Sequence, residues 1–301
     1  METQKINRIL IPVDFSETGL LALEHGAFMA RLFKADLYLL HVVEFMEPPY
    51  SLDASVMMGR VEYDEIEKEA IVKLNELVKK IKVQHGVSVI PMINRGRVIS
   101  GIYEAAKNNN VDLIVMGTHG AKGFDELFVG SNAHKTVTIS TCPVITIQKH
   151  AKKIGFTNIV IPIDNALHSR QKVETVIQLA IKYGAKIHIL GLINSNEKRD
   201  ENKFNIKIDS VEEAVKEAGL SYVREVIKGK NLAQSAMEYS KKVEADLIVI
   251  MTDHESDLTG MFLGLLSKQI INHSPIPVMS IRPIEGDIEW PDLTGTSNPF
   301  A

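Results

Sequence analysis

The sequence predicts an α/β protein made of two tandem, doubly wound domains, each with a five-stranded parallel sheet. Three observations lead to this prediction. The 301 residues, 45% of them hydrophobic, can fill two cores of ordinary domain size. The chain repeats its own motifs. Each copy also alternates short β-branched runs with longer segments of helical period.

The repeat is clearest in the apolar runs that open and close each copy. The run ILIPVD that starts at Ile9 matches IVIPID at Ile159, a shift of 150 residues. Near the end of each copy, CPVITI at Cys142 matches IPVMSI at Ile276, a shift of 134 residues. The second copy is therefore 16 residues shorter than the first. Repetition over most of the chain predicts two domains of one fold.

Polar and irregular segments mark the limits of the two copies. We expect a first domain over residues 1–150, a second over 151–284 and an irregular C-terminal tail over 285–301. The extra length of the first copy includes residues 47–50 (EPPY) and 57–59 (MMG), which have no counterpart in the second. These two segments predict a flexible arm before the second helix.

Within the first copy, near-continuous apolar runs predict strands that are buried on both faces. The predicted strands are 8–13, 36–43, 87–92, 111–116 and 143–147. The predicted helices are 17–33, 61–84, 98–108 and 131–139. In the second of these helices apolar residues recur on one face, at Ile66, Ala70, Leu74, Leu77, Val78 and Ile81. Strands that alternate with helices in this way predict right-handed crossovers and a parallel sheet.

Composition excludes several classes of function. The net charge of −4, with lysines spread along helical segments, disfavours a nucleic-acid partner. Cys142 is the only cysteine, so a disulfide framework is excluded. The N-terminal apolar stretch is too short for a signal peptide, and no segment approaches the roughly 18 to 20 apolar residues of a membrane helix. We therefore expect a cytoplasmic protein.

A ligand site is expected at the carboxyl ends of the predicted strands, where open parallel sheets bind their ligands. Asp14 follows the first strand, Val42 ends the second, and the sequence GTHG from Gly117 follows the fourth. Gly130 and Ser131 then open the last helix of the first copy. The glycines allow positive φ and close approach of the backbone, and the first helical amides have no partners, which suits a phosphate group. The alternative is that the glycines only turn the chain and Ser131 only caps the helix.

The residue pattern excludes other phosphate-binding motifs. The chain has neither the G-x-x-x-x-G-K-[ST] of a Walker loop nor the G-x-G-x-x-G of a dinucleotide fold. The first strand is followed by Asp14, Phe15 and Ser16 where a flavodoxin has a phosphate loop rich in threonine and serine. The third strand ends near Asn94, where a receiver domain has a phosphorylated aspartate.

The glycine pattern resembles that of the universal stress protein family, whose ATP-binding members carry G-x2-G-x9-G-[ST]. Here the pattern reads Gly117, Gly120, Gly130 and Ser131. The opening IPVDFS, the LLHV at the end of the second strand and the CPV before the last strand also resemble the family. The resemblance covers nearly the whole of residues 1–284 and implies a tandem, two-domain member with the adenine nucleotide α-hydrolase-like fold.

The resemblance implies that the first half binds ATP, together with Mg²⁺. Asp14 is expected to contact the nucleoside, although it could instead serve only as a favourable charge at a helix N-terminus. Val42 is expected to recognise adenine through its main chain, and Met116 and Gly117 to line the ribose. The expected nucleotide-binding residues are Pro12, Val13, Asp14, Val42, Met116, Gly117, Thr118, Gly120, Gly130, Ser131 and Asn132. Family members usually carry an apolar residue at the position of Asn132, which is compatible with a role of its backbone amide.

The second copy departs from this pattern. At the shift of 134, Met251 stands for Gly117, His254 for Gly120 and Leu265 for Ser131, and only Gly264 remains. We expect side chains to fill the space that backbone leaves open in the first copy. The second half is therefore predicted to be a structural or regulatory partner without the nucleotide mode of the family.

Several other residues have side chains that could bind a ligand or react. Asp253, His254, Glu255 and Asp257 could hold a metal ion, or form a solvated loop. His119 lies in the glycine loop and could relay a proton. We expect His41 and His188 to be core residues and Cys142 to be an inert buried thiol. No catalytic residue is predicted.

The resulting interpretation is a stress-response protein that binds ATP in its first half. The resemblance also implies that the two copies pair inside one chain as a pseudo-dimer, with residues 144–147 and 278–281 as the edge strands that meet, because these strands meet across dimers in the family and an unpaired edge is otherwise a liability. Further homodimerisation is compatible with this arrangement. Two alternatives remain open: slow ATP hydrolysis or autophosphorylation, and a module that binds proteins without a nucleotide.

Overall fold

The computed structural model describes residues 5–44, 54–118, 130–166, 168–194, 198–252, 254–257 and 260–283. In the first half the strands are β1 (Arg8–Pro12), β2 (Asp36–Val43), β3 (Val89–Arg95), β4 (Leu113–Gly117) and β5 (Val144–Ile147). The helices of this half are α1 (Glu17–Phe33), α2 (Ala54–His85), α3 (Val98–Asn108) and α4 (Ser131–Ile139). The predicted α/β class is confirmed.

The second half repeats the same order of elements. Its strands in the main sheet are β6 (Asn158–Ile163), β7 (Lys186–Ile193), β8 (Tyr222–Lys228), β9 (Leu247–Met251) and β12 (Val278–Ile281). Its helices are α5 (Val173–Tyr183), α6 (Lys198–Glu217), α7 (Leu232–Lys242) and α8 (Leu265–His273). A separate antiparallel hairpin consists of β10 (His254–Asp257) and β11 (Gly260–Leu263).

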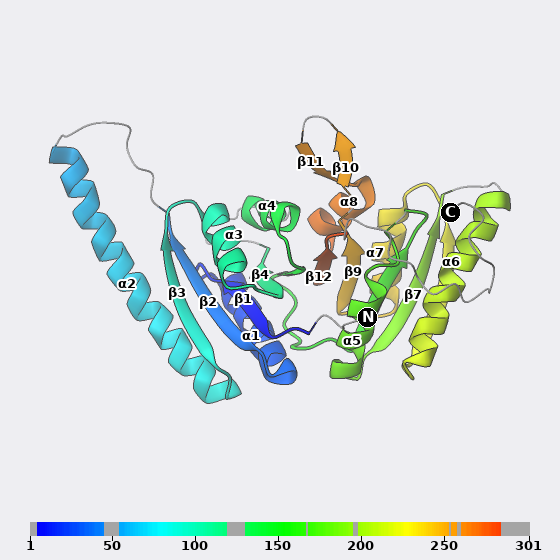
Figure 1. Cartoon of the computed structure of the whole chain (residues 1–301), viewed down its shortest axis with the longest axis horizontal. Helices are drawn as coiled ribbons and strands as arrows, with labels where there is room; N and C mark the ends of the chain where they lie inside the picture. Colours follow the sequence, from blue (N-terminus) through cyan, green and yellow to red (C-terminus); the bar gives the residue numbers. More distant parts are fainter. Residues whose placement is uncertain are drawn as a thin grey trace.

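The two halves share one ten-stranded sheet, in the order β3-β2-β1-β4-β5-β12-β9-β6-β7-β8 (Figure 1). Within each half neighbouring strands are parallel. At the seam, β5 and β12 pair antiparallel, with Ile145 opposite Met279. The two edge strands that were expected to meet therefore join directly, and neither is left as an open edge.

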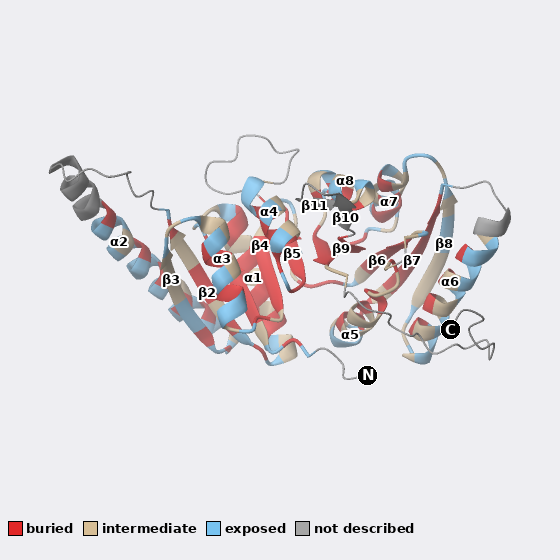
Figure 2. Ribbon diagram, turned by 45° about the horizontal axis from the view of Figure 1, so that its top comes forward, coloured by how far each residue is buried: buried red, intermediate tan, exposed pale blue. Residues whose placement is uncertain are grey.

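Helices cover both faces of the sheet. One core cluster packs α1, α2, α5 and α6 against one face, and a second packs α3, α4, α7 and α8 against the other. Figure 2 shows that buried residues concentrate in the central strands of each half. None of the helices in the described part of the chain is long and apolar enough to cross a membrane.

The strand β3 differs from its prediction. Of its residues only Val89 is buried, although we expected both faces of every strand to be covered. The reason is its position, because β3 is the outermost strand of the sheet and has a neighbour on one side only.

The helix α2 begins at Ala54, so residues 57–59 lie in the helix and not in an arm before it. The helix has 32 residues and α6 has 20, which accounts for twelve of the sixteen residues by which the copies differ. Residues 47–50 of the predicted arm, and the tail 285–301, lie outside the described residues.

The buried stripe of α2 also differs in one position. It runs through Tyr63, Ala70, Leu74 and Ile81, whereas Ile66 is 50% exposed. At about 100° per residue, Ile66 lies about 40° from Ala70, on the side away from Leu74. It therefore falls at the border of the stripe, outside the packed face.

Candidate functional site

A cavity of about 400 Å³ opens in the first half at the carboxyl ends of β1, β2 and β4. The strands β1 and β4 are neighbours, while the chain leaves β1 toward β2 and arrives at β4 from β3, so the cavity lies where the strand order reverses. Ten of the eleven predicted residues line it: Pro12, Val13, Asp14, Val42, Met116, Gly117, Thr118, Gly130, Ser131 and Asn132. The eleventh, Gly120, lies outside the described residues, as does His119.

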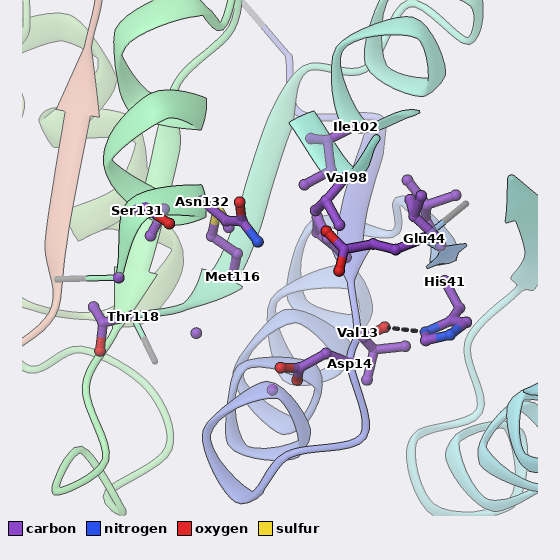
Figure 3. A pocket seen from close by; sticks show the side chains of 17 residues that line it. Val13, Asp14, His41, Glu44, Val98, Ile102, Met116, Thr118, Ser131 and Asn132 are labelled. Carbon is purple, nitrogen blue, oxygen red and sulfur yellow. Dashed lines mark hydrogen bonds between the residues drawn. The ribbon is translucent and has the colours of Figure 1, made fainter. Parts of the chain in front are cut away.

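The structure also brings residues to the cavity that the sequence patterns did not select. They are Gly19, Leu40, His41, Glu44, Val98, Ile102 and Ala133. Figure 3 shows Thr118, Ser131 and Asn132 on one side of the cavity and His41 and Glu44 on the other. One side is lined by apolar residues of β2 and α3, namely Leu40, Val42, Val98 and Ile102, whereas the opposite side is formed by the N-terminus of α4. The cavity is thus apolar at one end and rich in backbone amides at the other.

The backbone of Val42 faces the apolar end of the cavity. On β2 the carbonyl of Leu40 accepts a hydrogen bond from the amide of Val13 on the β1 side, and the carbonyl of Val43 accepts from Gly96 on the β3 side. Because successive residues of a strand point their amides and carbonyls to opposite sides, those of Val42 point to the β1 side. The strand β1 ends at Pro12, and among the described residues no backbone partner reaches these two groups. One donor and one acceptor are therefore presented side by side.

Within the described part of the chain, the Val42 amide is left without a backbone partner because the His41 imidazole occupies the Val13 carbonyl oxygen. The imidazole Nδ1 lies 2.7 Å from the carbonyl oxygen of Val13, the next acceptor after the end of β1 (Figure 3). A carbonyl only accepts, so Nδ1 carries the proton. The ring also packs against Phe15, with centroids 4.6 Å apart. Our expectation that His41 is a core residue was wrong, since it forms part of the cavity wall.

His188, by contrast, is a core residue as expected. It is buried, and its ring nitrogens lie 3.4 Å from Tyr239 Oη and Asn158 Oδ1. Burial lowers the pKa of His188, so the neutral imidazole is favoured.

The Asp14 carboxylate is held at the start of α1. Its Oδ1 accepts hydrogen bonds from the Ser16 amide at 3.1 Å and the Ser16 hydroxyl at 2.6 Å. The same hydroxyl accepts from the amide of Gly19 at 3.0 Å and so caps α1. A Cβ at residue 19 would lie only 2.6 Å from Asp14 Oδ1. Gly19 is therefore what allows this carboxylate to sit against the helix.

The N-terminus of α4 forms the polar end of the cavity. Gly130 is its N-cap and offers no side-chain cap, while its amide donates to the Thr118 carbonyl at 2.6 Å. The first amides of the helix lack intrahelical partners and lie at the positive end of the helix dipole. Ser131 and Asn132 are exposed next to them. This end of the cavity suits an anionic group.

The two described glycines of the motif act differently from our expectation of positive φ. Gly130 has φ −57°, an angle open to any residue. Gly117 is absent from the positive-φ glycines, and a Cβ there would lie 2.9 to 3.0 Å from backbone and side-chain atoms of Thr18. Gly117 is needed because β4 ends directly against the first turn of α1.

Around Pro162, Asp164 and Met251, the counterparts of Pro12, Asp14 and Gly117, the second half has a cavity of only about 10 Å³. Lys172, which stands for Ala22 of the first half, is 2% exposed and donates to the Ser169 carbonyl at 2.7 Å. The helix α5 starts only at Val173, the counterpart of Leu23, so the segment before it folds into this space. Leu265 does not fill it, because its side chain is 75% exposed.

The acidic and histidine run of the second half is not a loop. Residues His254–Asp257 form β10, paired with β11, and Asp253 lies outside the described residues. Within the part of the chain that the structure describes, no group of three or more histidine, cysteine, aspartate or glutamate residues could hold a metal ion.

Comparison with known proteins decides the family. The model of the universal stress protein family matches twice, over residues 5–148 and 155–282. The chain belongs to the universal stress protein family. Universal stress protein MJ0531 of Methanocaldococcus jannaschii is 32% identical over 146 residues, which cover 48% of this chain and 84% of that protein. Universal stress protein YxiE of Bacillus subtilis is 32% identical over 146 residues, covering 47% of this chain and 99% of its own.

Solved structures show the same tandem fold. A universal stress protein from Archaeoglobus fulgidus superimposes with a TM-score of 0.74 at 20% identity, covering 94% of this chain and 99% of the other. A second from Pseudomonas aeruginosa gives a TM-score of 0.70 at 17% identity, covering 94% and 95%. The curated relatives thus correspond to one universal stress protein domain, and these structures to both.

Proposed function

We propose that this universal stress protein binds one ATP per chain, in the cavity of its first half. The observation that carries the proposal is the contrast between the halves: the first has a cavity of about 400 Å³, whereas the second has only about 10 Å³ around the counterparts of Pro12, Asp14 and Gly117. The family and its glycine motif support the same ligand. In the cell the protein would serve the stress response as an ATP-dependent regulator in the cytosol.

The two ends of the cavity fit the two ends of ATP. The base would lie at the apolar end against Val42, Val98 and Ile102, where the Val42 amide and carbonyl can pair with the edge of the adenine ring. The phosphates would lie at the first turn of α4, whose amides and dipole favour negative charge. Asp14, between them, would contact the nucleoside.

Mg²⁺ would accompany the triphosphate and take its ligands mainly from the phosphate oxygens and water, as this ion usually does in nucleotide sites. This role requires no dedicated cluster of acidic residues.

Matched glycines in the two halves provide the test. Gly130 and Gly264 are both N-cap residues, with φ −57° and ψ 149° in the first half and φ −54° and ψ 152° in the second. Each can be replaced by valine, and MgATP binding measured by isothermal titration calorimetry on the full chain. We expect Gly130→Val to abolish binding and Gly264→Val to leave one site per chain unchanged.

Two outcomes would contradict the proposal. If the unsubstituted protein shows neither bound nucleotide nor an ATP-dependent rise in melting temperature, the first half is a scaffold for protein partners. If binding survives in Gly130→Val, the site lies elsewhere. ATP turnover above background that is lost in His119→Ala while binding is retained would assign an enzymatic role.

A further inference from the structure

Glu44 is a carboxylate at the apolar end of the cavity. It follows directly after β2, which ends at Val43, and it lines the cavity. Figure 3 shows its carboxylate extended toward the cavity, between Val98 and Val13. Glu44 stands two residues beyond Val42 and is exposed. The side chain therefore reaches the region in which the base would lie.

The Glu44 carboxylate makes no hydrogen bond or ion pair with any described residue. The other carboxylate of the cavity, Asp14, is tied to Ser16 by two hydrogen bonds. Glu44 is exposed at the mouth of the cavity, and Val98 and Ile102 line the same cavity. An ionised carboxylate can only accept hydrogen bonds. A ligand that covers this carboxylate displaces water from it and is therefore expected to offer it a donor in return.

The charge of Glu44 also separates the two ends of the cavity. Thr118, Ser131 and Asn132 lie on the far side from Glu44 in Figure 3, beside the amides of α4. A negative phosphate is favoured at those amides and disfavoured beside a carboxylate. The group that meets Glu44 thus belongs to the base end of the ligand.

Among purine nucleotides, the 6-position of the base differs in its hydrogen bonding. Adenine carries a 6-amino group, which is a donor, and hypoxanthine and guanine carry a 6-oxo group, which is an acceptor. A carboxylate facing the 6-position pairs with the first and repels the second. A site built to hydrogen-bond a donor group rejects an analogue that lacks it, because the polar group is left unpaired.

We propose that Glu44 accepts a hydrogen bond from the 6-amino group of adenine and so selects ATP against 6-oxo purine nucleotides. This inference rests on the proposed function of the cavity. It assigns base selection to a side chain, in addition to the main-chain groups of Val42, which can pair with either kind of base edge.

The test compares ATP with ITP, which have the same sugar and phosphates and differ at the base, where ITP carries a 6-oxo group and a protonated N1 in place of the 6-amino group and the unprotonated N1 of ATP. Calorimetry with Mg²⁺ on the full chain should show that ATP binds at least about tenfold more tightly than ITP. In Glu44→Gln the carboxamide can donate to a 6-oxo group, so the ratio should shrink to about threefold or less. Glu65→Gln, an exposed acid on α2, is the matched control and should keep the ratio of the unsubstituted protein.

The outcomes separate the two proposals. If neither nucleotide binds, the proposed function is wrong and the role of Glu44 is wrong with it. If ATP binds and the ratio of ATP to ITP affinity is the same in Glu44→Gln, the site stands and the inference is overturned. If Glu44→Gln instead changes the ratio of ATP to dATP affinity, Glu44 contacts the ribose and base selection by this residue is refuted.

Discussion

Replacing Gly19 by alanine tests whether the position of the Asp14 carboxylate matters for the ligand. The new Cβ would lie 2.6 Å from Asp14 Oδ1 and 3.2 Å from Ser16 Oγ, both shorter than an ordinary contact. Gly19 is in the first turn of α1, so the backbone itself accommodates alanine. The carboxylate is the part that must move, and it leaves its two hydrogen bonds to Ser16.

The expected change in stability is small because two effects oppose each other. Losing two exposed hydrogen bonds costs about 0.5–1.5 kcal/mol each. Alanine in place of glycine inside a helix contributes about 1 kcal/mol in the other direction. The free energy of unfolding should therefore fall by between about 0 and 2 kcal/mol. ATP affinity should fall more clearly, by about tenfold, because a charge-assisted contact to the nucleoside loses its geometry.

Urea unfolding measures the first quantity and isothermal titration calorimetry the second. Gly229→Ala is the control, since the nearest atom to its Cβ, Ser235 Oγ, is 3.9 Å away. The ATP affinity should stay unchanged, and the free energy of unfolding should rise by no more than about 1 kcal/mol. Gly19→Ala with the ATP affinity of the unsubstituted protein would refute a role of Asp14 in binding. A gain in stability of about 1 kcal/mol would refute the close contact itself.

Three further predictions concern the rest of the fold. Ile145 is buried in β5 opposite Met279, and its replacement by alanine should lower the free energy of unfolding by about 2–5 kcal/mol. A decrease below about 1 kcal/mol in urea unfolding would contradict tight packing at the seam. Burial lowers the pKa of His25 and His134, so near pH 6 the unfolded chain binds more protons than the folded chain does. The free energy of unfolding should therefore be at its full value above about pH 6.5 and should fall as the pH drops through that value. The urea midpoint is expected to be lower at about pH 5.5 than at about pH 7.5. Burial raises the pKa of Cys142 to about 11, so iodoacetamide should modify it only under denaturing conditions, and labelling of the folded protein would contradict its burial.

The sequence by itself determined the fold class and most of the site. Apolar runs such as Ile9 to Val13 are long enough for one buried strand, and their recurrence at a constant shift reveals two copies. The glycine spacing that ends at Gly130 located the N-terminus of α4, because a helix start after a glycine loop is a local property of the chain. Of the eleven residues that the family resemblance implied, ten line the cavity.

The tertiary structure decided which other residues share the cavity, because its walls come from strands that are adjacent in the sheet and distant in the chain. His41 looks like a core residue in sequence, yet the early end of β1 at Pro12 turns it into a wall of the site. Glu44 and Ile102 line the same cavity because α3 packs against β2. The closure of the second half likewise depends on Lys172, whose position follows from the late start of α5 and has no local signal in the sequence. Strand adjacency and the space left between side chains are properties of the packed sheet, so periodicity and motif spacing could not predict them.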